Sequence, residues 1–267
     1  MGEHQGDGTV GKALEVLDRV AAFRRPVRFS ELLEGSRFPK ATLYRLVQTL
    51  TSQRMLSFDP DRGVYAPGVR LVRLAHAAWR HSSLAPIARR HLDALSRATA
   101  ETVHLAQLDH GQVLYIDKRN AADPIDMFSQ AGKVGPAYCT GVGKAMLAFL
   151  APEALEAVLP QQAFHRFTPA TITDEGALRE ELAAVRAGGY ATDREEHEPG
   201  IVCVAAPVLA GRAVLGAVSV TSHTARRSLD ELEAWAPEIR RAAEAIGEEA
   251  RSWRFPGEPG DLEEGDG

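Results

Sequence analysis

The strongest hydrophobic pattern in the chain is a helical period over residues 37–50. Apolar side chains recur there at the spacing that places them on one side of a helix, at Leu43, Leu46, Val47 and Leu50. The opposite side is polar, with Arg45 and Gln48 near its centre. Arginine and glutamine carry the donors and acceptors that match base edges in the DNA major groove. The pattern predicts a helix that reads DNA or, alternatively, an ordinary amphipathic surface helix.

The segments on either side of this helix favour the DNA-reading interpretation. A helical period over residues 10–21 precedes it, and Ser30 is expected to cap a short helix over residues 31–34. Two short strands around the turn at residues 59–63 follow and predict a hairpin. Helix, short helix, turn, polar-faced helix and hairpin together are typical of a winged helix-turn-helix.

Charge supports the same interpretation. Lys and Arg outnumber Asp and Glu between residues 9 and 70, although the whole chain has a formal net charge of −5. A phosphate-binding face requires such a local basic excess. The residues expected to contact DNA are Arg37, Lys40, Ala41, Thr42, Tyr44, Arg45, Gln48 and Arg62. Arg45 and Gln48 are expected to read bases, while the lysine and the other two arginines hold phosphates.

A helical stretch over residues 69–99, interrupted at Pro86, follows the hairpin. Its apolar stripe predicts packing either within the monomer or against a second copy of the chain. Beyond residue 101 the period changes, and four strands are predicted at 103–109, 112–118, 201–209 and 213–221. Helices are predicted at 141–150, 174–187 and 230–251. Two strand pairs with covering helices predict an α+β domain built on an antiparallel sheet.

Overall composition is that of a folded globular protein, with 45% hydrophobic and 25% charged residues. No apolar run approaches the roughly 20 residues of a membrane span, and no secretion signal is recognised at the N-terminus. Cys139 and Cys203 are therefore expected to be reduced thiols in a cytoplasmic protein.

Three segments of the second domain carry candidate chemistry. Thr140 is expected to cap a helix with a glycine-rich first turn, whose bare N–H groups favour an anion, or else the glycines only permit a tight turn. Residues 190–200 are dense in polar groups and, taken alone, predict a solvated loop. Ser219 and Thr221 share one strand face, as ligand contacts or as satisfied polar groups of the core.

Several motifs occur together in the order and spacing of one known family. They are Phe38-Pro-Lys-Ala-Thr-Leu-Tyr-Arg-Leu46, Met127-Phe-Ser-Gln-Ala-Gly132, Cys139-Thr-Gly-Val-Gly-Lys-Ala145, Phe167-Thr-Pro-Ala-Thr-Ile-Thr-Asp174, Gly189-Tyr-Ala-Thr-Asp-Arg-Glu-Glu196 and Gly200-Ile-Val-Cys-Val-Ala-Ala-Pro207. Over residues 9–225 the chain resembles the isocitrate-lyase-regulator (IclR) family of bacterial transcription factors. One departure is Arg37, where the family often has glycine in the turn.

The resemblance implies a domain organisation and partners. It implies a winged helix-turn-helix over residues 9–68, a linker helix over 69–90, a GAF-like effector-binding domain over 91–254 and a disordered acidic tail over 255–267. Members dimerise or tetramerise on operator DNA, repress or activate transcription, and sense small organic or aromatic acids. RNA polymerase is a further expected partner, and no cofactor or metal is expected.

The resemblance also implies an effector site. Its residues here are Thr140, Gly141, Val142, Asp193, Cys203, Ser219 and Thr221. The backbone amides of Gly141 and Val142 are expected to hold the carboxylate of the effector. A rival interpretation is a thiol- or metal-dependent enzyme that uses Cys203, His197 and Asp193. The chain contains neither paired-cysteine metal spacing nor a Ser-His-Asp signature, which disfavours this alternative.

Overall fold

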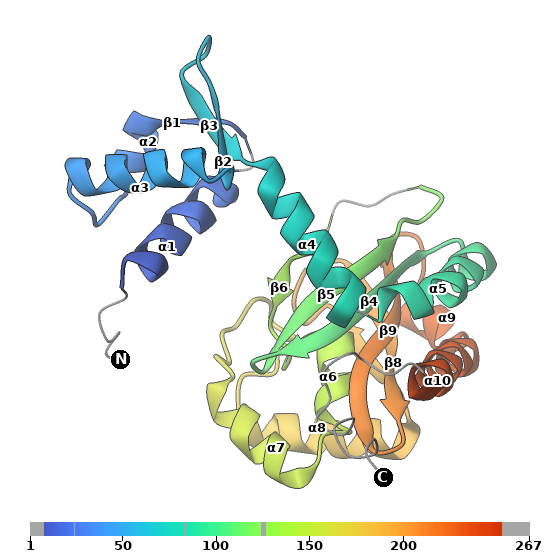
Figure 1. Cartoon of the computed structure of the whole chain (residues 1–267). Coiled ribbons are helices and arrows are strands. Elements are labelled where there is room, and N and C mark those ends of the chain that lie inside the picture. Colours follow the sequence, from blue (N-terminus) through green and yellow to red (C-terminus); the bar gives the residue numbers. More distant parts are fainter. Residues whose placement is uncertain (1–7, 24, 83, 124–126, 253–267) are drawn as a thin grey trace, which may run out of the picture. The chain divides into compact units, whose positions relative to one another are not determined.

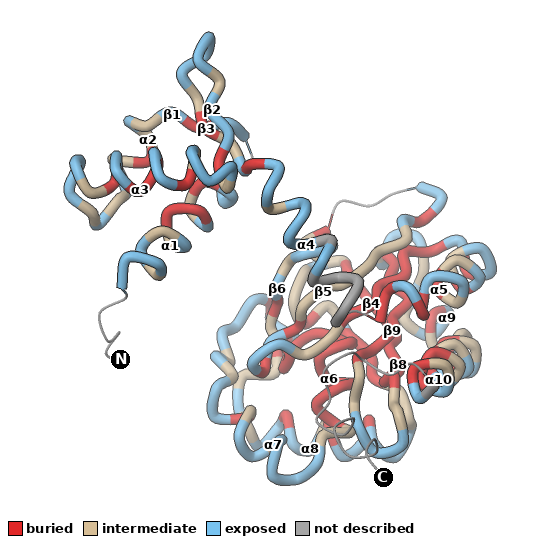
Figure 2. Tube along the Cα trace, viewed as in Figure 1, coloured by how far each residue is buried: buried red, intermediate tan, exposed pale blue. Residues whose placement is uncertain are grey.

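The computed structural model describes residues 8–23, 25–82, 84–123 and 127–252. The chain forms two compact units that meet in the sequence between His81 and Ser82. Each unit contains its own hydrophobic core, so each is described by itself (Figures 1 and 2). None of the helices within the described ranges combines the length and the apolar composition that crossing a bilayer requires.

The N-terminal unit is a winged helix-turn-helix. Its elements are α1 (Thr9–Ala22), β1 (Val27–Arg28), α2 (Phe29–Glu34), α3 (Lys40–Ser52), β2 (Leu56–Asp59), β3 (Val64–Pro67) and all but the last residue of α4 (Val69–Ser82). The strands form an antiparallel sheet in the order β1-β3-β2. The apolar side of α3 is buried as predicted, and Leu43, Leu46 and Val47 pack in one cluster with Val16 and Val20 of α1.

The second helix begins earlier than the sequence predicted. Arg28, not Ser30, is the N-cap of α2, and its backbone N–H donates to Glu31 Oε2 at 2.8 Å. The prediction for Ser30 is therefore wrong, because this residue lies inside the helix. Arg28 is extended since it pairs with Val64 in the small sheet, and the helix starts directly after that strand residue.

The C-terminal unit is an antiparallel sheet covered by helices, which confirms the predicted α+β class. Its strands are β4 (Thr102–Asp109), β5 (Gln112–Arg119), β6 (Val134–Gly135), β7 (Ala191–Arg194), β8 (Ile201–Ala210) and β9 (Ala213–His223). Its helices are α5 (Ala85–Thr99), α6 (Gly141–Leu147), α7 (Pro152–Val158), α8 (Glu175–Gly188), α9 (Leu229–Glu233) and α10 (Ala236–Ser252), with a 3-10 turn at Leu159–Gln161. The strand order is β6-β5-β4-β9-β8-β7.

The two faces of this sheet belong to separate clusters. On β8, Val204 packs with α5 and α10, whereas its neighbour Ala205 packs with α6 and α8. This alternation is the period of a strand that is buried on both sides. Figure 2 shows the central strands of the sheet as the most continuously buried part of this unit. The two predicted hairpins are confirmed, and β4 of one pairs with β9 of the other.

Two predictions for helices need correction. The helix predicted over residues 230–251 is divided into α9 and α10, because Pro237 in the first turn of α10 has no N–H for the carbonyl of Glu233. The helix predicted over residues 141–150 ends at Leu147.

The segment at residues 190–200 is not simply a solvated loop. Its residues Ala191–Arg194 form β7, an edge strand whose first three residues are buried. Asp193 lies opposite Cys203 in the antiparallel pair with β8. Pairing with the apolar strand β8 holds this polar segment in the sheet. The loop prediction is therefore wrong for Ala191–Arg194.

The predicted linker over residues 69–90 contains the whole of α4 and the beginning of α5. Ile87 and Ala88 of α5 are buried in the core of the C-terminal unit. The end of the predicted linker therefore belongs to a helix that covers the sheet. Pro86 stands in the first turn of α5, where its missing N–H costs nothing. The predicted acidic tail, residues 255–267, lies outside the described residues.

Candidate functional site

The polar face of α3 is open to solvent. Lys40, Ala41, Tyr44, Arg45 and Gln48 are exposed, and Thr42 is half-buried. The Tyr44 ring meets the edge of Phe29 at 5.7 Å between centroids, which holds it against α2. Within the described residues, the Arg45 guanidinium has no hydrogen bond or ion pair. A planar donor group on an exposed helix face is suited to a base edge or a phosphate.

The two outer arginines of this region differ in their surroundings. Arg37, before α3, forms an ion pair with Glu15 of α1 and lies over the Phe38 ring at 5.2 Å. This pairing orients Arg37, and any phosphate would compete with Glu15 for its guanidinium. Arg62 is exposed at the tip of the β2–β3 hairpin, where Gly63 takes a positive φ of 64° that favours glycine.

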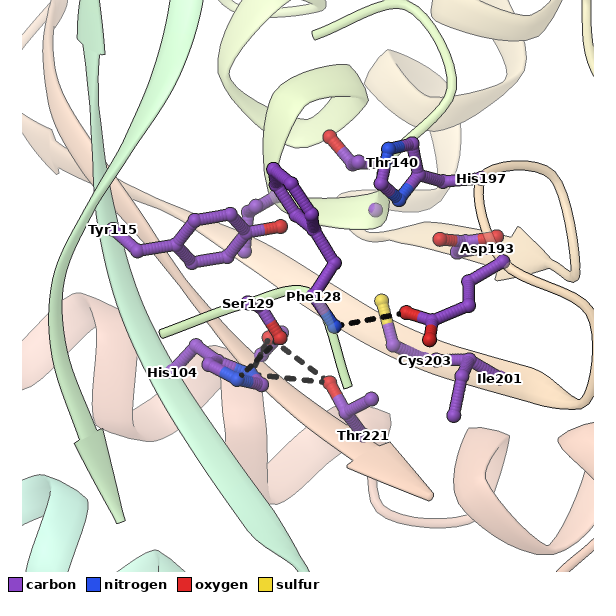
Figure 3. Close-up of a pocket in the computed structure, with 14 residues that line it drawn as sticks. His104, Tyr115, Phe128, Ser129, Thr140, Asp193, His197, Ile201, Cys203 and Thr221 are labelled. Carbon is purple, nitrogen blue, oxygen red and sulfur yellow. Dashed lines mark hydrogen bonds between the residues drawn. The ribbon is translucent and has the colours of Figure 1, made fainter. Parts of the chain in front are cut away.

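In the C-terminal unit, one cavity collects all seven residues that the sequence assigned to an effector site. They come from the start of α6 and from β7, β8 and β9, and they are Thr140, Gly141, Val142, Asp193, Cys203, Ser219 and Thr221 (Figure 3). The cavity is further lined by His104, Tyr115, Phe128, Ser129, His197, Glu198 and Ile201. Segments separated by about a hundred residues thus meet around one space.

The glycines at the start of α6 have a packing reason. A Cβ on Gly141 would lie 2.4 Å from Cys203 Sγ, and a Cβ on Gly143 would lie 2.3 Å from the Ala137 carbonyl oxygen. Both glycines therefore bring the helix start close to β8 and to the preceding chain. In the described part of the chain, the Val142 N–H has no hydrogen-bond partner. The same segment thus contains both the tight packing that requires glycine and a buried backbone N–H without a partner.

Thr140 is the N-cap residue of α6 by position, but its hydroxyl does not cap the helix. The Thr140 Oγ1 donates instead to the Pro136 carbonyl oxygen at 2.7 Å. The capping prediction is wrong for the side chain. This hydrogen bond holds the loop before α6 in place. The first-turn N–H groups of the helix therefore receive no hydrogen bond from the Thr140 hydroxyl.

A buried charge network lies beside the cavity. Lys144 of α6 is fully buried, and its Nζ lies 2.5 Å from Glu196 Oε1 and 2.9 Å from Glu181 Oε1. Burial alone favours the neutral amine, but the two carboxylates outweigh it and raise the pKa of Lys144 above its ordinary value. The ammonium therefore remains charged and joins α6 to α8 and to the segment after β7.

Asp193 is the acidic group of the cavity itself. Its Oδ1 accepts the backbone N–H of Glu196 at 2.8 Å, and its side chain is buried. Burial, together with the nearby Glu196 charge, raises the pKa of Asp193 to about 7. The carboxyl group is therefore partly protonated near neutral pH and offers either a donor or an acceptor.

The two thiols are buried. Burial raises the pKa of both Cys139 and Cys203, with the Asp193 charge acting in the same direction. His197 contacts the rings of Phe128 and Phe167, at 5.0 and 4.7 Å between centroids. No hydrogen bond joins His197 to Cys203 in the structure as described, and no cluster of three metal-ligating side chains is found in the same residues.

The cavity is small, with a volume of about 30 Å³. A space of this size holds no more than a few water molecules. An organic acid of several carbon atoms therefore requires some of the lining side chains to move apart.

Comparison with known proteins identifies the family of this chain. The pattern of the IclR helix-turn-helix domain matches residues 9–60, and that of the bacterial transcriptional regulator IclR C-terminal domain matches residues 76–248. The chain belongs to the IclR family. It is a transcriptional regulator with a DNA-binding helix-turn-helix domain and a C-terminal ligand-binding domain. Among its relatives, the regulator XynR of Escherichia coli K12 is 31% identical over 239 residues, which cover 89% of this chain and 95% of that protein.

Solved IclR structures have the same architecture. The Thermotoga maritima IclR is 30% identical with a TM-score of 0.76, and the match covers 91% of this chain and 98% of that one. An IclR homologue from Microbacterium hydrocarbonoxydans, complexed with 4-hydroxybenzoate, is 23% identical with a TM-score of 0.79 and 92% and 100% coverage. At this low identity, the similarity to the Microbacterium hydrocarbonoxydans homologue shows a shared fold and nothing more.

Sequence reasoning missed His104 in this IclR-family cavity. His104 is buried in the middle of β4 and lies opposite Ser219 of β9 in the sheet. Its Nε2 lies 2.9 Å from Ser129 Oγ, and its Nδ1 faces Thr221 Oγ1 at 3.3 Å. A histidine among Val103, Leu105 and Ala106 was the available signal, but its partners depend on the pairing of β4 with β9.

Proposed function

We propose that this IclR-family regulator binds operator DNA through α3 and the β2–β3 hairpin, and that a small carboxylate in the cavity alters that binding. One observation carries the effector part of the proposal. Seven residues assigned from separate sequence segments line a single cavity. A pocket with convergent polar groups and a shifted pKa is the usual character of a ligand site.

The start of α6 and Asp193 supply complementary contacts for a carboxylate. The Val142 N–H is free to donate, and the Gly141 N–H lies against Cys203 Sγ, which an effector oxygen would replace. Asp193 carries a proton for part of the time near pH 7, so that it donates to a carboxylate oxygen instead of repelling it. These groups bind an anion without a metal or a cofactor.

On the DNA side, Arg45 and Gln48 read bases while Lys40 and Arg62 hold phosphates. Arg37 reaches a phosphate only if it leaves Glu15. Two such helices bind paired half-sites one helical turn apart, so the functional form is a homodimer or a homotetramer. The effector shifts the balance between two arrangements of the assembly and thereby changes operator affinity or contact with RNA polymerase.

The enzyme alternative finds less support although its three residues line the same cavity. A catalytic cysteine requires a thiolate, whereas burial raises the pKa of Cys203. His197 packs between phenylalanine rings instead of activating the sulfur. The relatives named above are regulators, and the cavity is better suited to holding a ligand than to reacting with it.

A screen of small organic and aromatic acids by thermal shift tests this proposal. A ligand at about 100 times its dissociation constant stabilises a protein by about 2.7 kcal/mol, which a melting curve resolves. Each acid that stabilises is then added to a mobility-shift assay with the DNA upstream of the gene. A carboxylate that raises the melting temperature and changes the DNA shift supports the proposal. DNA binding that no bound acid alters would contradict the effector role.

A further inference from the structure

A second pocket of the C-terminal unit lies at the edge of its sheet, where β7 is the last strand. Its volume is about 190 Å³, against about 30 Å³ for the proposed effector cavity, and the two share no lining residue. Such a volume accommodates a small organic molecule. We call it the edge pocket, and its lining residues are Glu181, Ala184, Val185 and Gly188 of α8, Tyr190, Thr192 and Arg194 of β7, and Glu233 of α9.

Thr192 brings a buried hydroxyl without a partner to the edge pocket. Side chains alternate along a strand, so Thr192 lies on the opposite face of β7 from Asp193 and the proposed effector cavity. Thr192 is 3% exposed, yet its Oγ1 has no hydrogen bond within the described residues. Buried hydroxyl groups are normally paired. This oxygen therefore has capacity for a donor that the rest of the described chain does not supply.

Glu181 presents an open carboxylate oxygen to the same pocket. Its Oε1 accepts from Lys144 Nζ at 2.9 Å and from Arg194 Nη1 at 3.3 Å. Its Oε2 has no hydrogen bond in the part of the chain that the structure describes. Burial opposes ionisation of Glu181, but the two cations outweigh it and hold its pKa below the ordinary value. Glu181 is therefore an ionised and fixed acceptor with one oxygen to spare.

Glu233 leaves the edge pocket with an excess of negative charge. Among the described residues, Glu233 has neither an ion pair nor a hydrogen bond. Glu181 is paired with Lys144 and Arg194, and Lys144 also neutralises Glu196 behind the pocket. Three carboxylates thus face two cations, and the charge without a counterpart is that of Glu233. This imbalance favours a cationic ligand over an anion.

A primary ammonium group matches the open acceptors of the edge pocket. It has three N–H donors and no acceptor, and Thr192 Oγ1, Glu181 Oε2 and the Glu233 carboxylate all accept. Tyr190 adds an aromatic ring, whose face attracts a cation, and Val185 adds apolar surface for a carbon chain. A transition metal is less suited, because the lining contains two carboxylates and neither histidine nor cysteine.

We propose that the edge pocket binds the ammonium group of a small primary amine. Glu233 supplies the neutralising charge, and Thr192 and Glu181 accept the remaining N–H groups. The site is distinct from the proposed effector cavity, so an amine and an acid bind to the same chain without competing for one space.

Titration of the full-length protein with butylamine tests the inference. Butanol is the matched probe without the charge, and butyltrimethylammonium retains the charge but has no N–H donor. The methyl NMR signals of Val185, identified by their loss in Val185→Ala, report occupancy of the edge pocket. We expect butylamine to shift these signals with a millimolar dissociation constant and to bind about tenfold more tightly than either analogue, the contribution of one hydrogen bond to a charged group.

Variants then locate the preference. Glu233→Gln and the isosteric Thr192→Val should each weaken butylamine binding about tenfold. Thr192→Ser retains the hydroxyl and should restore most of the affinity. Glu180→Gln is the matched control, since Glu180 is exposed on α8 and does not line the edge pocket. It removes the same charge and should leave the affinity within about twofold, because exposed charges are screened by salt.

Three results would overturn the inference. Equal binding of butylamine and butanol by the parent would show that only the carbon chain is recognised. Unshifted Val185 signals at tens of millimolar butylamine would leave solvent as the occupant. Unchanged affinity in folded Glu233→Gln and Thr192→Val would place the amine elsewhere, and should Thr192→Val fail to fold, the half-buried Glu233 decides through Glu233→Gln. None of these results depends on acid binding, so the proposed effector function stands or falls separately.

Discussion

The two regions proposed to bind ligands in this regulator use polar residues in opposite ways. On α3 the polar side chains are exposed, and the helix is held by apolar residues behind them. Around the cavity the polar side chains are themselves buried and hold one another in place. A large polyanion reaches an exposed face, whereas a small acid needs groups that are already desolvated. Substitutions on α3 should therefore change binding alone, and those around the cavity should change both binding and stability.

The largest difference in unfolding free energy should come from replacing one lysine by methionine in each region. Lys144→Met removes the cation between two carboxylates, one of which, Glu196, is only 4% exposed. Breaking such a buried pair costs about 3–5 kcal/mol because it leaves an uncompensated charge. Lys40→Met on the exposed face should change stability by no more than about 0.5 kcal/mol. Urea unfolding of the two variants measures the difference, and similar losses in both would break the comparison.

The next effect concerns pH. Asp193 has a folded-state pKa of about 7, above its ordinary value of 3.8, so the folded protein holds this proton more tightly than the unfolded chain. The stabilisation is present at low pH and lost as pH rises through 7. Relative to Asp193→Asn, the parent should lose about 2–3 kcal/mol of unfolding free energy between pH 5 and 8. Parallel stability profiles for the two proteins would show that Asp193 titrates normally.

On the DNA side, Arg45→Ala should alter recognition without altering the fold. We expect a loss of about 1–3 kcal/mol in operator affinity and a relaxed preference at one base position. The melting temperature should stay that of the parent, because Arg45 has no partner in the described residues. Binding to operator and to random DNA, measured by fluorescence anisotropy, gives the specificity ratio. An unaltered ratio would remove Arg45 from the base-reading role.

The smallest effect is expected at the tip of the wing. Arg62→Ala should weaken binding about equally for operator and random DNA and should reduce the salt slope by about one. Arg62 is exposed and stands beside the turn at Gly63, so a phosphate contact carries no sequence information. A titration of binding against salt measures the slope. A loss confined to the operator would instead indicate a base contact.

The same comparison explains what could be predicted from the sequence. The buried side of α3 repeats with the helical period, so Leu43, Leu46, Val47 and Leu50 were identified, and the exposed polar face followed from them. The hairpins of the sheet followed from short apolar runs and the turn residues between them. The division between α9 and α10 was missed although Pro237 was visible, because the helical period continues across it.

The cavity was less accessible to sequence reasoning. The polar segment that contains β7 looks solvated until Lys144 and β8 are known to pack against it. His104 meets Ser219, 115 residues away, only through the register of β4 with β9. Local patterns singled out Thr140 and its glycine-rich turn, and Ser219 with Thr221, but only the family resemblance joined all seven residues in one site. Burial of polar groups depends on distant partners, and this is why the cavity residues could not be derived one segment at a time.

The most direct test of the account is the operator affinity of the parent and of Ser219→Ala/Thr221→Val, each with and without an acid that stabilises the parent. If the cavity controls DNA binding, the acid should change the parent's dissociation constant for DNA by about 5-fold or more. The double variant should bind DNA with the parent's acid-free affinity and lose this response. An equal response in both proteins, or none in the parent, would contradict control of DNA binding from this cavity.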